Sequence, residues 1–543
     1  MPLCQSLVII RGKFSNNGRE DIIMSTQNLT RTSGILLHPT SFPSPYGIGD
    51  LGKEAYEFID FLEKAGQRLW QILPLTPTGF GDSPYQSFSA FAGQPLIISP
   101  DKMKELGLLT EEDLADCPAG DGSTVDYGTI VPWKTKILKL AFEKFQTVED
   151  KVLLKEYKAF IKDNKEWLVD YALFMACKDK HEGRNWHSWE EEYRNPTKAE
   201  KKAMSKVFEA DMQYHYFVQF MFYKQWGELR TYANERDIKI IGDMPLFMSM
   251  DSADVWANQG LYQLDSQGYP LAVAGVPPDY FSKTGQLWGN PLYDWKAHKK
   301  EKFKWWVSRI RTQLKLADYV RIDHFRGLDE YWSVPAGEET ALNGEWKDGP
   351  KEDLFYAIEE ALGGELPIIA EDLGTITQSV RDLRDKFNLP GMKILQFGFE
   401  AKDESSFLPH NFETMNCVCY TGTHDNDTTK GWYETAPEKA KDKVRRYMNT
   451  DGSNICWDFI RTCFGTVAAY AVVPMQDVLG VGKEGRLNTP GVAVANWAWR
   501  YKKDVLTDWL AGILLENTKL YGRYKEEEVI DVEEEEGEEA VND

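Results

Sequence analysis

Leu366-Pro-Ile-Ile-Ala-Glu371 is a short apolar run that ends in a carboxylic acid, and Ile238-Lys-Ile-Ile-Gly-Asp243 repeats its form. Nearly continuous hydrophobic runs of this length are typical of parallel strands that are buried on both faces. Further segments of the same kind lie on either side along the chain. The sequence predicts eight strands, at residues 34–38, 68–73, 238–243, 319–323, 367–371, 392–397, 417–421 and 469–474.

Helical segments lie between these strands. Residues 52–67 carry an apolar stripe at helical spacing that includes Phe58, Phe61 and Leu62, and residues 302–316, 354–362 and 379–387 are similar. Alternating strands and helices imply crossover connections and a parallel sheet. Eight strands predict an α/β fold of the closed (β/α)8 or TIM-barrel type, with an open doubly wound sheet as the alternative.

Two intervals interrupt the alternation. Residues 76–237 are too long for a simple loop, and most of them are rich in helix formers and tryptophan, so we predict an inserted, mainly helical subdomain at about 100–237. Glycine and proline punctuate residues 252–300, which predicts a structured loop that covers the site as a lid. The catalytic barrel with these insertions is expected to span residues 31–522.

The two ends of the chain have a different composition. Residues 1–30 form an unassigned leader, within which Met24 could be the true start. Residues 526–543 hold eleven Asp or Glu and no Lys or Arg, which is half of the net charge of −22. We predict that residues 523–543 form a disordered, solvated acidic tail, with an acidic interaction tail as the alternative.

The net charge, the apolar runs and the cysteines of the chain exclude several classes of protein. A strongly negative charge argues against general binding to nucleic acid or anionic membranes, and no apolar run approaches the ~18 residues of a membrane span. The seven cysteines are odd in number and irregular in spacing, and Cys417-x-Cys419 has no second pair at zinc spacing. Reduced thiols suit a cytoplasmic protein.

Acidic residues stand at the ends of four predicted strands. Asp243, Asp323 and Glu371 end the third, fourth and fifth strands, and Asp425 follows the seventh. A single such aspartate is often only a helix N-cap. In a (β/α)8 barrel, however, the chemistry lies at the C-terminal ends of the strands. Four acids at one rim therefore favour an active site.

The surroundings of two of these acids differ. Arg321 and Asp323 are two residues apart on one strand and face the same side, so the guanidinium is predicted to lower the pKa of Asp323 and keep it ionised as a nucleophile. A structural salt bridge is the alternative. The apolar run before Glu371 is predicted to raise its pKa, as a general acid requires. Strand parity alone does not choose between Glu371 and Asp372. Such a pair, ~5–5.5 Å apart, is typical of retaining glycosidases.

A polar cluster, Thr423-His-Asp-Asn-Asp427, follows the seventh strand. Asp425 is suited to holding sugar hydroxyls, while a metal site of His424, Asp425 and Asp427 is the alternative. Aromatic residues in polar or Gly/Pro-rich segments could stack on sugar rings or simply pack; they are Tyr85, Tyr280, Phe281, Trp288 and Tyr293.

Several long segments together resemble the amylomaltases, which are the 4-α-glucanotransferases or disproportionating enzymes of glycoside hydrolase family 77 in the α-amylase clan. The resemblance covers roughly residues 30–522, with small departures at Phe42 and Thr76. The matching segments are 34–38, 47–52, 71–75, 81–87, 242–245, 251–256, Gly275-Val-Pro-Pro-Asp-Tyr-Phe-Ser282, Gln286-Leu-Trp-Gly-Asn-Pro291, Arg321-Ile-Asp-His-Phe-Arg-Gly327, Ala370-Glu-Asp-Leu-Gly374, Gly422-Thr-His-Asp-Asn426 and Asn496-Trp-Ala-Trp-Arg500.

This resemblance implies roles for individual residues. Asp323 would be the nucleophile, Glu371 the general acid/base and Asp425 the stabiliser of the transition state. Substrate-binding roles would fall to Tyr85, Asp243, Gln286, Trp288, Arg321, His424 and Asn496. No metal and no cofactor is implied.

The implied reaction moves a segment of an α-1,4-glucan to the 4-hydroxyl of glucose or of another α-1,4-glucan, through a covalent glycosyl-enzyme. Maltooligosaccharides would be donors, and glucose or maltooligosaccharides acceptors. Three alternatives stay open: an α-glucan hydrolase, a catalytically silent glycan-binding protein, and a phosphate-binding barrel enzyme. The intact carboxylates count against the second, and the lack of a glycine-rich phosphate loop counts against the third.

Overall fold

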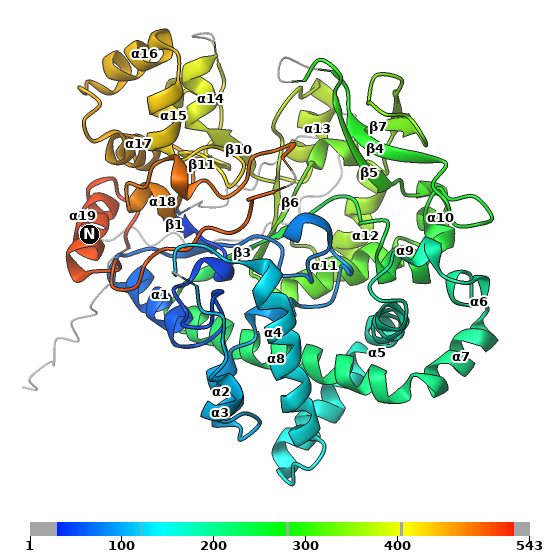
Figure 1. Cartoon of the computed structure of the whole chain (residues 1–543). Coiled ribbons are helices and arrows are strands. Elements are labelled where there is room, and N and C mark those ends of the chain that lie inside the picture. The colour runs from blue at the N-terminus through cyan, green and yellow to red at the C-terminus, as the bar shows by residue number, and fades with distance from the viewer. Residues whose placement is uncertain (1–29, 121, 279–281, 402–404, 493, 526–543) are drawn as a thin grey trace, which may run out of the picture.

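The computed structural model describes residues 30–525, except 121, 279–281, 402–404 and 493. Eight strands form one sheet in which each hydrogen-bonded pair is parallel. Along the sheet they lie in the order β10, β11, β12, β1, β2, β3, β6, β9 (Figure 1). Their bounds are β1 Thr32–Leu36, β2 Leu69–Gln71, β3 Lys239–Met244, β6 Tyr319–Ile322, β9 Ile368–Ala370, β10 Gly391–Ile394, β11 Cys417–Tyr420 and β12 Tyr470–Pro474.

The two ends of this sheet meet. The amide N–H of Ala370, at the end of β9, donates to the carbonyl oxygen of Pro390 at 2.9 Å. The N–H of Met392 in β10 donates to the Asp372 carboxylate at 2.8 Å. The sheet is therefore a closed barrel, which confirms the predicted (β/α)8 fold and rules out the open sheet. Each predicted strand lies in place, although residues 395–397 begin helix α14 instead of extending β10.

Apolar side chains fill both sides of the barrel wall. One layer inside it takes side chains from most strands, among them Leu36, Ile241, Ile369 and Val472, all at most 1% exposed. The outer faces pack against helices, as expected for strands that are apolar on both faces. The four predicted helices are confirmed as α1 Lys53–Lys64, α11 Lys304–Leu316, α12 Glu352–Leu362 and α13 Gln378–Lys386.

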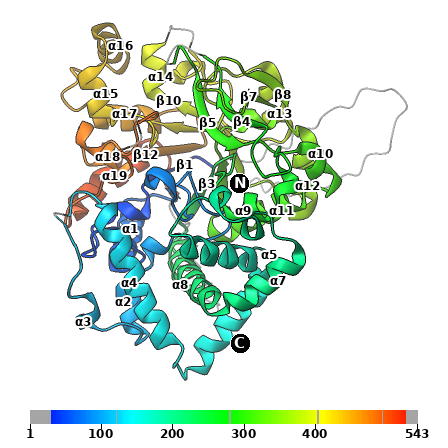
Figure 2. The same cartoon turned by 45° about the vertical axis from the view of Figure 1, so that its right-hand side comes forward.

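Between β2 and β3 the chain is mainly helical and projects from one side of the barrel (Figures 1 and 2). The last of these helices, α8, also covers the barrel, because Phe222 and Trp226 join the main core and the Trp226 indole donates to Leu316 O at 2.8 Å. The limits of an inserted subdomain stay a prediction. The helices are α2 Pro100–Glu105, α3 Glu111–Leu114, α4 Tyr127–Phe145, α5 Lys151–Lys180, α6 Glu191–Arg194, α7 Lys198–Val207 and α8 Glu209–Asn234.

A second, antiparallel sheet stands beside the barrel mouth, in the order β5, β4, β7, β8 (Figure 2). The sequence did not predict it. Its strands are β4 Ala272–Val276, β5 Gln286–Pro291, β7 Glu330–Pro335 and β8 Glu345–Asp348. The predicted lid, 252–300, thus contributes two strands, together with α9 Ala253–Ala257 and α10 Trp295–Lys300. Its tip, with Tyr280 and Phe281, lies outside the described residues.

The C-terminal third of the barrel carries further helices, at Leu395–Glu400 (α14), Thr429–Thr435 (α15), Glu438–Met448 (α16), Ile455–Phe464 (α17), Met475–Val478 (α18) and Asp508–Leu520 (α19). Among the helices of the described chain, none has the length and apolar character that crossing a membrane requires. The predicted leader and acidic tail fall almost wholly outside the described residues.

Two arginines tie the ends of the described chain together at the bottom of the barrel, where the strands begin. Arg31 precedes β1, and Arg523, which is 1% exposed, follows α19. Together they donate to the carbonyl oxygens of Thr32, Phe464, Thr466, Ala469 and Tyr521, over 2.8–3.4 Å. We call this pair the arginine clasp. Since these carbonyls belong to several separate elements, the clasp locks the closing strands and the last helix into one base.

Candidate active site

The polar residues predicted at the strand ends lie on one rim of the barrel. Asp243 lies near the end of β3 and faces Arg321 of β6 in the strand register. Asp323 and Glu371 directly follow β6 and β9, and Asp425 comes five residues after β11 ends. Because β3, β6 and β9 are neighbours in the sheet, three of the four acids lie side by side.

Arg321 holds two of these acids. Its Nη1 donates to both oxygens of Asp243 at 2.7 Å, and its Nη2 donates to Oδ1 of Asp323 at 2.8 Å. The Arg321 and Asp243 side chains are 4% and 0% exposed, whereas the Asp323 side chain is 31% exposed. The buried ion pair is thus the one with Asp243, and Asp323 is the carboxylate that this pair presents to solvent.

The predicted pKa of Asp323 was wrong in direction. Burial raises the pKa of Asp323 above its ordinary value, and the Arg321 guanidinium only partly opposes that rise. The sequence showed Arg321 but not the depth of the site, nor that Asp243 shares the same guanidinium. Arg321 nevertheless remains the nearest positive charge and donates directly to Asp323, which favours the ionised form of that carboxylate.

Glu371 is held by two backbone amides. The N–H of His324 donates to Oε2 at 2.7 Å, and the N–H of Leu373 donates to Oε1 at 2.8 Å. His324 adopts a left-handed conformation, with φ 54°, in the turn that follows β6. Burial, followed by the charge of Asp323, raises the pKa of Glu371 to about 8 against the opposing effect of these donors. Glu371 therefore keeps its proton at neutral pH, in the direction predicted.

Asp372, the competing candidate, faces away from the rim. Its carboxylate accepts from Arg384 Nη1 at 2.5 Å and from the Met392 N–H at 2.8 Å. The contact to Met392 bridges to β10 at the point where the barrel closes, and the contact to Arg384 ties Asp372 to α13. The contacts of the two adjacent acids thus separate them, with Glu371 at the site and Asp372 in the wall.

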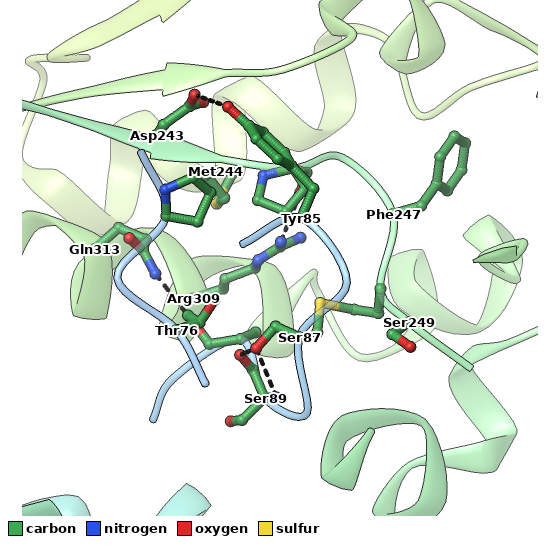
Figure 3. Close-up of a pocket in the computed structure, with 14 residues that line it drawn as sticks. Thr76, Tyr85, Ser87, Ser89, Asp243, Met244, Phe247, Ser249, Arg309 and Gln313 are labelled. Atoms are coloured by element: carbon green, nitrogen blue, oxygen red, sulfur yellow. Dashed lines mark hydrogen bonds between the residues drawn. The ribbon is translucent and has the colours of Figure 1, made fainter. Parts of the chain in front are cut away.

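Tyr85 connects the two halves of the site. Its hydroxyl donates to Oδ2 of Asp243 at 2.7 Å, as Figure 3 shows, and lies 2.9 Å from Nε2 of His424. A hydroxyl has a single proton, so Nε2 of His424 is the donor in the second contact. Burial raises the pKa of Tyr85 well above its ordinary value, so the hydroxyl stays neutral. The Tyr85 and His424 rings also stack, with centroids 5.3 Å apart.

Asp425 is fixed by residues that the sequence did not single out. The Asn488 amide Nδ2 donates to Oδ1 of Asp425 at 2.6 Å, and Arg486 Nη2 donates to the Asp425 carbonyl oxygen at 3.0 Å. Oδ2 of Asp425 lies 3.4 Å from Nε2 of His424. One chain of polar contacts therefore runs from Asp323 through Arg321, Asp243, Tyr85 and His424 to Asp425.

Trp497 is a further residue that the sequence did not single out. Its ring centroid lies 5.8 Å from that of Tyr85 and 6.0 Å from that of His424.

Asp427 does not join the proposed metal ligands. Its Oδ1 accepts from the Thr428 N–H at 2.8 Å, at the start of α15, and its carboxylate lies against Gly431 of that helix. His424 and Asp425 are engaged with each other and with Tyr85. Within the described part of the chain, no group of three metal-ligating side chains converges. The structure therefore gives the metal alternative no support.

The remaining predicted binding residues have separate positions. Trp288, on β5, meets His324 edge to face, with centroids 4.8 Å apart, and its indole donates to Gln286 at 3.2 Å. Both residues thus lie beside the turn that holds Glu371. The Asn496 side chain instead bonds the backbone of its own loop, at Thr489 and Val492. Tyr293 is only 1% exposed and donates to Leu246 O at 2.9 Å, which makes it a core residue.

A small recess below Tyr85 and Asp243 is lined by Ser87, Met248, Arg309 and Gln313 among others (Figure 3). Arg309 is 1% exposed and donates to the carbonyl oxygens of Pro245 and Leu246. The Arg309 guanidinium is therefore bonded to the backbone that follows β3. We interpret the residues that line the recess as structural support beneath Tyr85 and Asp243.

The rim of this barrel pairs Glu371, whose pKa is raised, with an aspartate that accepts a hydrogen bond from arginine, an arrangement typical of the class of enzymes that break glycosidic bonds with carboxylic acids. Comparison with known proteins narrows this class. Residues 37–507 match a family described as 4-alpha-glucanotransferase. The chain belongs to that family, glycoside hydrolase family 77.

Individual relatives agree with this assignment. A 4-alpha-glucanotransferase of Synechocystis is 49% identical over 91% of this chain and 98% of its own, and one of Thermus thermophilus is 48% identical over 87% and 95%. The structure of an amylomaltase from Streptococcus agalactiae in complex with acarbose is 40% identical, covers 91% of this chain and 100% of its own, and superposes with a TM-score of 0.88. The family and the 4-alpha-glucanotransferase activity that the sequence predicted are confirmed.

Proposed function

We propose that the protein transfers a segment of an α-1,4-glucan to the 4-hydroxyl of glucose or of another α-1,4-glucan by a retaining double displacement in which Asp323, Glu371 and Asp425 act together. Asp323 attacks the anomeric carbon and forms a glycosyl ester, while Glu371 gives its proton to the departing glycosidic oxygen. The observation that carries this proposal is that the two carboxyl groups have different surroundings. The pKa of Glu371 is raised to about 8, whereas Asp323 accepts a hydrogen bond from the Arg321 guanidinium.

In the second step Glu371, now a carboxylate, takes the proton from the 4-hydroxyl of the acceptor as that oxygen attacks the ester. The Arg321–Asp243 ion pair keeps Asp323 in position throughout. Asp425, with its carboxylate 46% exposed, is suited to accept hydrogen bonds from sugar hydroxyls as positive charge develops on the ring. The binding of acarbose by the Streptococcus agalactiae amylomaltase supports an α-glucan cleft here.

His424 joins Arg321 and Asp243 around the sugar at the cleavage point, while Tyr85, Gln286, Trp288 and Asn496 line the glucan groove. Trp288 offers an aromatic face beside the His324 turn, and the His424 ring lies next to Asp425, with its Nε2 3.4 Å from Oδ2 of that residue. Asn496 contributes through the shape of its loop. A cytoplasmic location is also part of the proposal, and it is supported by the free thiols of the six cysteines in the described chain.

Transfer is expected to be much faster than hydrolysis. Water is ~10⁴-fold more concentrated than a millimolar acceptor, so the site must favour sugar over water by ~5–6 kcal/mol merely to break even. The β4–β5 arm of the lid stands beside the turn that holds Glu371, where it can hold an acceptor and exclude water.

Maltotriose incubation followed by chromatography tests this expectation. We expect glucose and a ladder of longer oligosaccharides, with almost no increase in total reducing ends. A steady rise in reducing ends without products longer than maltotriose would identify an α-glucan hydrolase instead. If no product depends on the enzyme, both the transferase and the hydrolase activity would be contradicted.

The rate is expected to fall on the alkaline side of about pH 8. The raised pKa of Glu371 means that the acid is protonated below about 8 and loses its proton as the pH rises through that value. The measurement is the pH profile of kcat/KM for maltotriose. An α-glucosyl fluoride donor, whose leaving group needs no proton, is the control and should show a weaker alkaline fall. A profile for maltotriose that stays flat to pH 10 would contradict this role.

A further inference from the structure

Two side chains from the segment after β12 grip Asp425. Asn488 donates to its carboxylate at 2.6 Å, the shortest contact that Asp425 makes among those of the described residues. Arg486 donates to the Asp425 carbonyl oxygen through Nη2 at 3.0 Å, and to the Asn488 carbonyl oxygen through Nε at 2.8 Å. One guanidinium therefore ties the Asp425 loop to the Asn488 loop. We call Arg486 and Asn488 the Asp425 clamp.

The clamp is itself anchored. Leu487, between its two members, is 4% exposed and packs in the main core. The Leu487 carbonyl oxygen accepts from the Trp497 N–H at 2.7 Å, and Trp497 packs on Tyr85 and His424. The loop that provides the clamp is thus held at two places, by Leu487 in the main core and by Trp497 beside the site. Such a mounting fixes a donor more firmly than a free surface loop would.

Asp425 needs this support because its side chain is partly exposed. A carboxylate that is 46% exposed would otherwise turn freely about its last torsion. Here Oδ1 takes the Asn488 amide while Oδ2 lies 3.4 Å from His424. The carboxylate plane is therefore set before substrate arrives, with His424 defining one side and Asn488 the other. Groups that act on a transition state are most effective when they are oriented in advance.

We infer that Asn488 is a positioning residue for catalysis, which orients the Asp425 carboxylate toward the developing charge on the sugar. This inference rests on the proposed role of Asp425. Asn488 gives a neutral donor, so it orients the carboxylate without placing a second full charge beside it. A cation in its place would compete with the sugar for that charge.

Kinetics of Asn488 variants test the inference. For Asn488→Ala and for Asn488→Leu, which keeps the volume but not the amide, kcat is expected to fall about 10- to 100-fold. KM should change by less than about threefold, because the ground state depends little on Asp425. Asn517→Ala is the matched control, since the Asn517 amide also donates a hydrogen bond, here to the backbone carbonyl oxygen of Ile513 in α19, far from the site. That control should keep kcat.

The pH dependence of Asn488→Asp separates orientation from mere packing. Below its pKa the introduced carboxyl donates a hydrogen bond to Asp425 as the amide does, whereas above it the two carboxylates repel. Activity of N488D relative to wild type should therefore rise severalfold as the pH falls from about 8 to about 5. Full activity of Asn488→Leu, or an N488D defect that is equal at every pH, would overturn the inference.

A double variant distinguishes this failure from failure of the proposed function. If the clamp acts through Asp425, Asn488→Ala should cost almost nothing further in an Asp425→Asn background. If Asp425→Asn itself keeps more than about a tenth of kcat, the role of Asp425 is wrong. If Asp425→Asn is inactive but Asn488→Ala is normal, only the clamp is wrong.

Discussion

Asp323→Asn is expected to lower kcat by about 10⁴-fold or more while the protein stays folded. The amide cannot form the glycosyl ester, yet it is isosteric and can still accept the hydrogen bond from Arg321 Nη2. The buried partner of Arg321 is Asp243, so the ion pair that shapes the floor survives the change. Initial rates on maltotriose and a thermal unfolding curve measure the two quantities.

The product of azide rescue identifies the nucleophile more directly. With Asp323→Ala and an activated α-glucosyl fluoride, azide can replace the carboxylate in a single displacement and should give the inverted, β-linked azide. Retention of more than about a tenth of the wild-type rate by Asp323→Asn, or an α-linked azide from Asp323→Ala, would show that the nucleophile lies elsewhere.

Glu371→Gln is expected to show a similarly large loss on maltotriose but a much smaller loss in the first step with the fluoride donor. The amide cannot protonate a sugar leaving group, whereas fluoride departs without that help. In Glu371→Ala, azide should attack the ester on Asp323 and give the retained, α-linked azide, opposite to the outcome at Asp323.

Asp372→Asn is the matched control for Glu371→Gln, since the two acids are adjacent. The Asp372 carboxylate bonds Arg384 and the Met392 N–H in the barrel wall, so its change should lower the melting temperature but spare kcat of the folded enzyme. Loss of kcat in Asp372→Asn together with full activity of Glu371→Gln would reverse the assignment.

The sequence predicted the barrel because its strands are buried on both faces and read as unbroken apolar runs. The antiparallel sheet escaped prediction for the opposite reason. β8 is mostly exposed, and β5 has an exposed beginning and contains Gly289, so neither forms a run of that kind. Prediction from pattern therefore succeeded for the barrel strands, which are buried on both faces, and failed for β5 and β8, which have solvated residues.

The site was predictable to a similar extent. Strand ends located Asp243, Asp323 and Glu371 because neighbouring parallel strands end at one rim. The net pKa shift of Asp323 was not predictable, since depth of burial and the sharing of Arg321 with Asp243 appear only after folding. Asn488 lies 63 residues beyond Asp425 in an irregular segment, so no spacing rule connects them.

The arginine clasp lies at the opposite end of the barrel from the acids of the rim. It closes the bottom of the barrel mainly through backbone carbonyl oxygens, with one further contact to the Thr466 hydroxyl. The proposed active site lies at the opposite rim, which carries the β4–β5 pair and the Asp425 clamp. A change in the loops at that rim therefore need not disturb the base, because the two sets of contacts share no residue. The geometry that holds the chain ends together and the geometry that holds the acids are set at separate ends of one barrel.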